Sequence, residues 1–571
     1  MSVTAATLAV VQVSRVVRIL ELTLLLACLL LVAGGLAGWF ARKRSGVARP
    51  RGQGLRSHAL SLLVFTASGA LLRIAGGSRV PGYEGQRGEG LGFAELAARL
   101  GSPPPGLDPH GSGPAMLAQL FFGVVPRTEV AWLTLQATLA VLTIPLVYLG
   151  ALAWLRSKRE ATWAAAVYAL LPSVACFAMT EVRPVAGSFF LMLALVLTGA
   201  AITAARATWL AAAGLFAVLA TSFHPVLAPA PLVLGCVLVA REDGWAFVKT
   251  PGALLALAAI VLSWVILLQL LWLQMATGGE GLASLPHMTR VLLPTLGASP
   301  SLPFNAFLNT YCTPPVVTLL WVVGFATVAL PARRRVVLAL AFAALAMTLP
   351  GMSGGRLALA RLQYAAAPLH AMLAGVGVVA LLELLSRKVG SSRVKQALPA
   401  GLAVALGLSV AAFPGPLAGA FVYESERRVV LRAAPELPAE CDVWVAPTEE
   451  GAYRGAPSYL TAPNVPAARW HALERVQDVH PRVAASLGRD GCAYYYRPSA
   501  CWAQLRDEAP PQPDPSVLRT ECAATEARLQ LEPLHVESIA AVPAAAASYR
   551  RPVIEVGFFR IRALRSDTTA P

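Results

Sequence analysis

Hydrophobic residues fill most of the chain in long runs, and short polar segments separate one run from the next. Several runs reach the roughly 20 apolar residues that a helix needs to cross the hydrocarbon core of a bilayer. The pattern predicts about twelve membrane-spanning helices and therefore a mainly α-helical, polytopic membrane protein. The helices are expected at residues 17–40, 59–76, 131–155, 161–179, 185–205, 207–223, 226–240, 251–275, 315–330, 336–349, 365–385 and 397–420.

The polar segments predict the direction of each helix. Arginine and lysine cluster in segments 42–56, 156–159, 333–335 and 387–395, and such basic loops stay on the cytoplasmic side of a membrane. With these segments on one side, the predicted helices alternate without conflict, and the first helix places the N-terminus outside. The apolar run at 114–125 is too short to span and would invert every later helix, so we expect it to be re-entrant or interfacial.

A change in composition near residue 421 marks the start of a different domain. Residues 421–571 are richer in charge, proline and glycine and contain no run long enough to span a membrane. "CDVWVAP" and "PVIEVGFFRIRAL" have the pattern of strands, and "AARWHALERVQDVHPRVAASL" has helical spacing. We expect an N-terminal helix and basic cytoplasmic loop at 1–58, a transmembrane domain at 59–420 with an outer loop at 77–130, and a soluble extracytoplasmic α/β or α+β domain at 421–571.

Composition excludes two classes of protein. Only 14% of the 571 residues are charged and 56% are hydrophobic, whereas a soluble domain carries about 25% charged residues. The net charge of +16 is spread over short loops between apolar runs. It therefore acts as a topology signal and does not predict a nucleic-acid partner.

Cysteine usage indicates an oxidising compartment for the C-terminal domain. Four of the eight cysteines lie there, at Cys441, Cys492, Cys501 and Cys522, which predicts one or two disulfides. A bond between Cys492 and Cys501 is one pairing, and spacing alone does not select it. The remaining cysteines include Cys28, Cys176 and Cys236, which we expect to pack as small apolar residues in membrane helices.

Polar residues of the predicted outer segments are the candidates for chemistry. Charged groups beside a bilayer cost free energy unless they are solvated or paired, so they often mark a cavity. The simpler alternative is a solvated loop charge, which we favour for Glu95 because Arg99 lies four residues later on an apparent helix. We likewise expect His370 to be a satisfied core histidine, and Tyr494, Tyr495 and Tyr496 to be core residues more than a sugar-stacking surface. The candidates are Glu84, Glu89, Asp108, His110, Glu181, Arg183, His224, Arg356 and Arg361.

The order of four motifs resembles the GT-C class of membrane glycosyltransferases, which includes the dolichyl-phosphate-mannose-protein mannosyltransferases and ArnT. "GEGLGFAELAARL" resembles the acidic pair of the class, with Glu89 on its second acid, and "LDPHGSGPAM" resembles its "HPP" stretch, with His110 on the histidine. "TEVRP" and "RLQYAAAPLHAMLAGVGV" are similar to later elements, with Arg361 and Tyr364 on an arginine-tyrosine pair. The resemblance covers most of 59–420. Gly88 stands where the first acid is expected, and Glu84 is the nearby alternative.

The resemblance implies an integral membrane glycosyltransferase of the hexosyl or pentosyl type that inverts the anomeric carbon. It would move a sugar from a polyprenyl-phosphate donor to a glycan, lipid or protein acceptor of the cell envelope, on the outer face of the bacterial inner membrane. Glu89 or Glu84 would be the catalytic base, and a divalent cation, Mg²⁺ or Mn²⁺, is the one cofactor to consider. The substrate-binding residues would be Asp108, His110, Glu181, Arg183, Arg356, Arg361 and Tyr364.

Two other functions stay open from the sequence. A flippase or transporter for a lipid-linked glycan would carry internal repeats and charged or broken helices near the middle of the bilayer. A non-catalytic scaffold of envelope assembly would explain Gly88 and the replacement of "HPP" by "HGSGP".

Overall fold

The computed structural model describes the helical part of the chain and several segments of the C-terminal part. The described residues are 16, 19, 20, 22–33, 55–76, 113–126, 129–178, 184–277, 313–349, 363–389, 391–412, 429, 432–433, 436–438, 440–445, 470–473, 477, 479–498, 501, 522–540 and 553–565.

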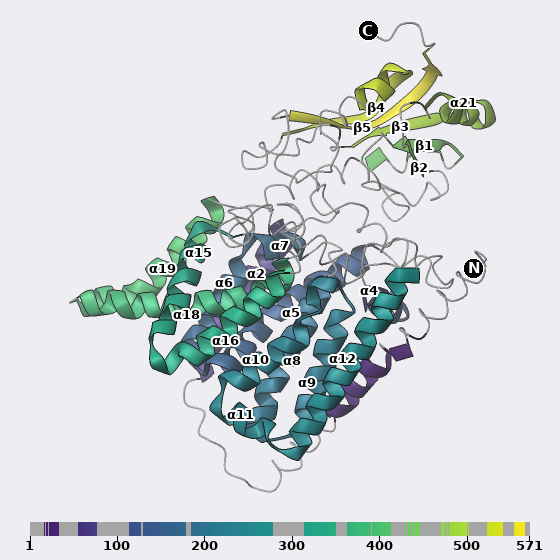
Figure 1. Cartoon of the computed structure of the whole chain (residues 1–571). Helices are drawn as coiled ribbons and strands as arrows, with labels where there is room; N and C mark the ends of the chain where they lie inside the picture. Colours follow the sequence, from purple (N-terminus) through teal and green to yellow (C-terminus); the bar gives the residue numbers. More distant parts are fainter. Residues whose placement is uncertain are drawn as a thin grey trace, which may run out of the picture.

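Helices pack side by side to form the larger part of the molecule (Figure 1). They form because long apolar runs satisfy every backbone hydrogen bond internally, as a membrane requires. Their bounds are α2 Leu55–Gly76, α4 Gly113–Phe122, α5 Glu129–Leu155, α6 Lys158–Leu170, α7 Pro172–Phe177, α8 Pro184–Ala204, α9 Ala207–Thr221, α10 Ala230–Ala240, α11 Glu242–Val248, α12 Pro251–Thr277, α15 Pro315–Ala326, α16 Pro331–Thr348, α18 Ala367–Lys388 and α19 Ser392–Ala412. The 3₁₀ turns are η2 Pro225–Leu227, η4 Thr327–Ala329 and η6 Gln363–Ala365.

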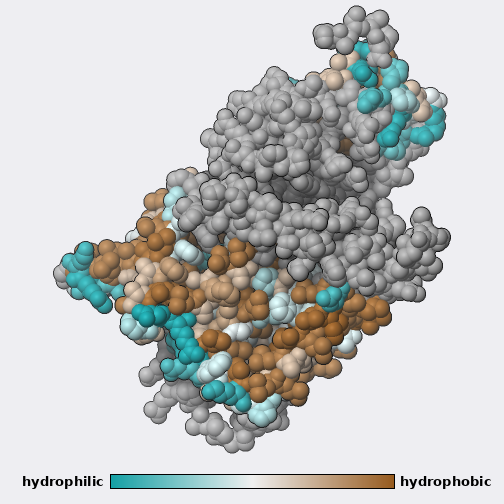
Figure 2. Space-filling model, viewed as in Figure 1, coloured by the Kyte–Doolittle hydropathy of each residue, from teal (hydrophilic) through white to brown (hydrophobic). Residues whose placement is uncertain are grey.

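The described helices identify a membrane protein. Four of them, at Thr134–Leu155, Pro184–Ala204, Pro251–Leu270 and Ala367–Lys388, are long and apolar enough to cross a bilayer. The central one is α8, whose best window is 78% buried, while the window in α12 is 22% buried and faces outward. Figure 2 shows the resulting hydrophobic surface over the helices. The total of about twelve spans stays a prediction.

Two sequence interpretations of the helical part need correction. The predicted helix 161–179 is broken into α6 and α7, because Pro172 lacks the N–H that would continue α6. The helix predicted at 336–349 begins at Pro331, so the three arginines at 333–335 lie in its first turns and not in a loop. The short run at 114–125 forms the ten-residue helix α4.

Glycines hold α15 against α18. A Cβ atom added to Gly377 would lie 1.8 Å from the carbonyl oxygen of Leu320, and one added to Gly324 would lie 2.1 Å from that of Leu373. Such close approach of two backbones is possible only without side chains, as in many membrane helix pairs. The two helices therefore share a tight seam along these glycines.

Gly377→Ala is expected to destabilise the protein by about 1–3 kcal/mol, because the new methyl group must push α15 away from α18. Thermal unfolding in detergent measures the effect. Gly401→Ala in α19 is the matched control, since nothing lies within 4 Å of the added Cβ atom, and it should be neutral or slightly stabilising. Equal melting temperatures of Gly377→Ala and Gly401→Ala would contradict the tight contact between α15 and α18.

Ion pairs gather basic segments at one end of the helices. Arg156 and Arg241 both pair with Asp243, and Arg333 pairs with the buried Glu160. These residues come from the ends of α5 and α10 and the starts of α6, α11 and α16. Figure 2 shows hydrophilic surface along the lower left edge of the helical part. We call this end the basic end.

Hydrogen bonds from the Arg241 guanidinium are the main cause that lowers the pKa of Asp243 below its usual value. A lowered pKa in the folded state stabilises the protein above the unfolded pKa, and this contribution is lost as the pH falls through the folded value. The melting temperature of Asp243→Asn is therefore expected to fall less steeply below about pH 4 than that of the unmodified protein. The change should stay below about 1 kcal/mol, because the side chain of Asp243 is 41% exposed. A melting curve series from pH 7 to about pH 3 tests this, and an unchanged slope would contradict it.

The C-terminal part contains a five-stranded mixed sheet in the order β2-β1-β3-β5-β4. Strand β1 pairs in parallel with β2 and β3, while β5 runs antiparallel to β3 and β4. The strands and their helix are β1 Asp442–Val445, β2 Trp470–Ala472, α21 Val479–Asp490, β3 Ala493–Arg497, β4 Leu529–Ala540 and β5 Val553–Leu564. In Figure 1 the sheet lies on the opposite side of the helices from α11.

The disulfides join Cys441 to Cys492 and Cys501 to Cys522. The pairing of Cys492 with Cys501 is therefore wrong. These residues flank the extended strand β3, whose five residues separate its ends by about 16 Å. Cys441 and Cys492 instead precede neighbouring parallel strands and meet at one end of the sheet. The free cysteine Cys28 is buried, as expected for an apolar packing residue.

The hydrophobic pattern of the C-terminal domain predicted two strands correctly and one helix only in part. The strands expected in "CDVWVAP" and "PVIEVGFFRIRAL" are β1 and β5. The helix expected over "AARWHALERVQDVHPRVAASL" is wrong for its first part, because Trp470–Ala472 pairs with β1 as strand β2. Tyr494, Tyr495 and Tyr496 are 6%, 0% and 2% exposed, so they are core residues of the sheet.

Candidate functional site

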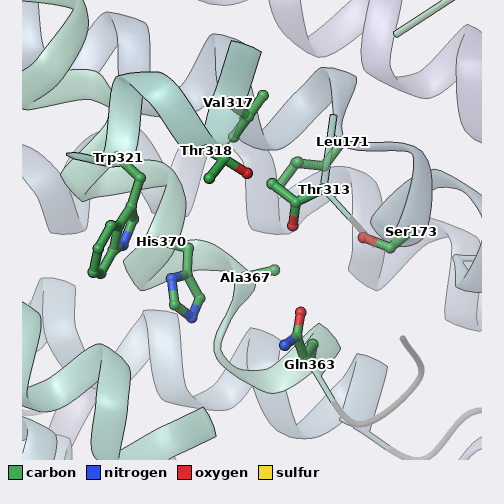
Figure 3. Close-up of a pocket in the computed structure, with 9 residues that line it drawn as sticks. All are labelled: Leu171, Ser173, Thr313, Val317, Thr318, Trp321, Gln363, Ala367 and His370. Atoms are coloured by element: carbon green, nitrogen blue, oxygen red, sulfur yellow. The ribbon is translucent and has the colours of Figure 1, made fainter. Parts of the chain in front are cut away.

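A polar pocket lies at the end of the helices opposite to the basic end. It is bounded by the break between α6 and α7, by η6, and by the first turns of α15 and α18 (Figure 3). Its cavity volume is about 30 Å³, room for on the order of two water molecules. The lining residues are Leu171, Ser173, Thr313, Val317, Thr318, Trp321, Gln363, Ala367 and His370.

Prolines bring the helix ends to the pocket. Pro172 separates α7 from α6, Pro315 begins α15, and Pro368 lies in the first turn of α18. Proline is suited to the first turn of a helix, where its missing N–H is not needed. The amino ends of α15 and α18 therefore direct their partial positive charge toward the same space.

Small polar side chains face into the pocket. Figure 3 shows the oxygens of Ser173, Thr313, Thr318 and Gln363 pointing toward a common space. Ser173 is only 6% exposed, and its hydroxyl makes no hydrogen bond to any residue that the structure describes. Hydroxyl and amide groups both donate and accept hydrogen bonds, so this space can hold a hydroxyl-rich group.

His370 lies in the pocket wall, and residues of α15 and α16 fix the position of its ring. Its Nε2 atom is 2.9 Å from the hydroxyl oxygen of Thr348, at the end of α16. Its ring centroid is 6.3 Å from that of Trp321 on α15. The hydrogen bond agrees with the interpretation of His370 as a satisfied histidine, and it also fixes the ring at the pocket.

Two predicted candidates are among the described positions. His224 is 7% exposed, and its Nδ1 accepts the N–H of Val226 at 3.1 Å. Tyr364 is the other. It lies in η6, is 1% exposed, and its hydroxyl is 3.5 Å from the hydroxyl of Tyr168. The hydroxyl of Ser188 donates to its carbonyl oxygen at 3.5 Å. These contacts fix the chain immediately after Arg361, and a contact of Tyr364 with substrate stays a prediction.

Arg73 supports the same region from α2. Its guanidinium is fully buried and donates to the carbonyl oxygens of Ala169 at 3.0 Å and Tyr168 at 3.4 Å. These carbonyls lie at the end of α6, where Pro172 offers no N–H to Tyr168. Arg73 therefore satisfies the end of a helix that proline has interrupted.

The other predicted site residues lie outside the described residues, but the ends of their segments meet. Gly113, after His110, donates its N–H to the carbonyl oxygen of Ser222 at 2.9 Å. Phe223 packs against both Gly113 and Gly187, and Gly187 follows Arg183 in the first turn of α8. Ser188 bonds to Tyr364, three residues after Arg361. One chain of contacts thus joins the ends of three outer segments. The undescribed residues are Glu84, Glu89, Asp108, His110, Glu181, Arg183, Arg356 and Arg361.

Sequence reasoning missed several residues of this region. Ser173, Thr318 and Gln363 are single small or polar residues in apolar surroundings, and no spacing marks them. Arg73 did carry a signal, because an arginine inside an apolar run is costly and usually has a specific partner.

Comparison with known proteins gives structural similarities alone. No protein-family model and no curated protein matches the sequence. The structure is similar to the Archaeoglobus fulgidus oligosaccharyltransferase tethered with an acceptor peptide, at 13% identity and a TM-score of 0.44, over 72% of this chain and 64% of that one. It is similar to AglB of the same organism in complex with an inhibitory peptide and a dolichol-phosphate, at 13% identity and a TM-score of 0.43, over 77% and 69% of the chains.

A third similar structure is ArnT from Cupriavidus metallidurans bound to undecaprenyl phosphate, at 13% identity and a TM-score of 0.45, over 87% and 97% of the chains. The matched region spans somewhat less than two thirds of the first oligosaccharyltransferase. At these TM-scores the similarity says nothing about the substrate or reaction of this chain. The resemblance to GT-C glycosyltransferases is confirmed in the sense that an oligosaccharyltransferase and ArnT are among the structural neighbours.

Proposed function

We propose that the chain is an integral membrane glycosyltransferase. It moves a hexosyl or pentosyl group from a polyprenyl-phosphate donor to a glycan, lipid or protein acceptor, on the outer face of the bacterial inner membrane. One observation carries the proposal: the ends of the three outer segments that hold the candidate acids and cations meet in one network beside a polar pocket. A lipid-linked donor explains why such a pocket belongs to a membrane protein, since its tail stays among the helices while its sugar reaches a wet site.

The proposed reaction needs a base and a cation. The Glu89 carboxylate, or that of Glu84, takes the proton from an acceptor hydroxyl as its oxygen bonds to the anomeric carbon. The bond from that carbon to the phosphate oxygen breaks with inversion, and polyprenyl phosphate leaves with the electron pair. Arg361, with Arg356 as the second choice, stabilises the phosphate through paired hydrogen bonds.

The remaining candidates are assigned to binding. Asp108, His110, Glu181 and Arg183 position the acceptor, and Tyr364 helps to hold the donor site in shape. A divalent cation, Mg²⁺ or Mn²⁺, fits the carboxylates of the outer segments, because both metals prefer oxygen ligands. Within the described ranges no group of three His, Cys, Asp or Glu side chains could hold a metal, so the outer-segment carboxylates are the residues that would do so.

The C-terminal domain is proposed to recognise the acceptor outside the membrane. Its sheet lies on the opposite side of the helices from α11, the side of the pocket. Its two disulfides suit an oxidising, extracytoplasmic location.

The test is to incubate the purified protein in nanodiscs with a panel of polyprenyl-phosphate sugars and to measure release of polyprenyl phosphate. Protein-dependent consumption of one donor is expected, and it should fall when the protein is heat-inactivated. Movement of a lipid-linked glycan across a liposome membrane without release of phosphate would instead support a flippase. If the folded protein shows neither sugar transfer nor lipid-linked glycan movement, the result would support a non-catalytic scaffold, the function that Gly88 favours.

A further inference from the structure

The surface of α16 combines exposed cations with an exposed apolar stripe. Arg334 and Arg335 are exposed near its start. Leu338, Phe342 and Leu345 are 46%, 60% and 41% exposed. These positions follow Arg335 at spacings of three and four residues, so they lie on one face of the helix. The opposite face is buried against the other helices, with Leu340, Ala343, Ala344 and Met347 all 0% exposed.

The length of the stripe matches one leaflet of a bilayer. Ten residues separate Arg335 from Leu345, which corresponds to about 15 Å of helix. One leaflet contributes half of the roughly 30 Å hydrocarbon core. The ends of α16 fix its direction: Arg333 pairs with Glu160 at the basic end, while Thr348 bonds to His370 at the pocket end. The two exposed arginines therefore lie at the level of headgroups and the stripe at the level of acyl chains.

The neighbouring helix ends extend the positive surface. Arg387 and Lys388 end α18, Arg393 and Lys395 begin α19, and all four are exposed. In the part of the chain that the structure describes, none of them and neither exposed arginine of α16 forms an ion pair with a carboxylate. By contrast, the cations Arg156 and Arg241 at the same end share Asp243.

This contrast separates the surface from an ordinary topology signal. Basic loops suffice to orient helices, wherever their cations point. Here six exposed cations from three helices lie together with one exposed carboxylate of α18, that of Glu383, so the surface keeps a clear positive excess beside an apolar stripe of acyl-chain length. Anionic lipid headgroups are attracted to such juxtamembrane clusters.

We propose that this face of α16, with the end of α18, binds one anionic phospholipid of the surrounding membrane. The phosphate contacts Arg334 and Arg335, and an acyl chain runs along Leu338, Phe342 and Leu345. The site lies at the opposite end of the helices from the pocket, so it is separate from any donor site there.

Native mass spectrometry tests the site on the full chain, after incubation with equal amounts of phosphatidylglycerol and phosphatidylcholine. One phosphatidylglycerol is expected to be retained in preference to phosphatidylcholine. Arg334→Gln combined with Arg335→Gln should weaken its binding by about tenfold to thirty-fold, the loss expected for two cations at an anionic lipid surface. Phe342→Ala should weaken it a few-fold without changing the preference for the anionic headgroup.

The matched control is Arg156→Gln combined with Lys249→Gln, which removes the same charge from the same end of the helices beside Glu242 and Asp243. It should retain phosphatidylglycerol as the unmodified protein does. Glycerol 3-phosphate, which has the headgroup chemistry and no acyl chain, should not raise the melting temperature. Equal retention of both lipids, equal loss in both double variants, or stabilisation by glycerol 3-phosphate would each overturn the proposal.

Discussion

Glu89→Gln is expected to lower the rate of sugar transfer about 10²–10⁴-fold, the usual contribution of a positioned general base. Glutamine keeps the size of the side chain and removes the carboxylate that takes the acceptor proton. Release of polyprenyl phosphate, measured with the donor that the unmodified protein consumes, gives the rate. Because the substitution removes a proton acceptor and leaves donor recognition in place, binding of the donor should change much less than the rate.

Glu95→Gln is the matched control for this variant. It changes the same residue type six positions later in the same outer loop, where we expect a solvated pair with Arg99. Its rate should stay within about twofold of the unmodified protein. If Glu89→Gln and Glu95→Gln transfer sugar equally well, Glu89 is not the base. A large loss in Glu84→Gln would then move the role to Glu84.

Arg73→Met is expected to destabilise the protein by about 3–5 kcal/mol. Arg73 donates to three carbonyl oxygens, those of Gly69, Tyr168 and Ala169, and its guanidinium lies 5.5 Å from the ring centroid of Tyr168. Methionine fills much of the volume but donates no hydrogen bond. A buried carbonyl left without a donor costs about 1–3 kcal/mol, and the end of α6 would lose the donor that Pro172 does not supply.

Thermal unfolding in detergent measures this loss, and Arg159→Met is its control. Arg159 lies on α6, at the end opposite to the carbonyls that Arg73 caps, and is exposed, so its replacement should change stability by less than about 0.5 kcal/mol. If the cost of burying the Arg73 charge outweighs its hydrogen bonds, Arg73→Met would instead raise the melting temperature. An unchanged or raised value therefore contradicts the role of Arg73 as the cap of α6.

The apolar runs were sufficient to predict most helices within a few residues. The run at 251–275 became Pro251–Thr277, and the run at 185–205 became Pro184–Ala204. Their limits are readable because prolines and charged residues stop an apolar run at the same positions at which they start or end a helix. The break at Pro172 was not predicted, since the run continues through it and only the missing N–H ends α6.

Properties that depend on tertiary contacts were not readable from the chain. The disulfide pairing follows from which strands are neighbours, and strand β2 is a short segment that pairs in parallel with β1, which no local pattern indicates. The pocket combines residues from four places between Leu171 and His370, and no local pattern joins them. The assignments of Glu89 and Arg361 rest on motif resemblance and stay predictions.

The glycine seam limits which walls of the pocket can move. Thr318 and His370 lie on α15 and α18, the two helices that Gly324 and Gly377 hold at backbone contact. These two helices cannot separate without breaking the backbone contacts at the glycines, so they form a rigid part of the pocket wall. If the proposed sugar is larger than the resting cavity, the wall expected to move is the six-residue helix α7 with Ser173.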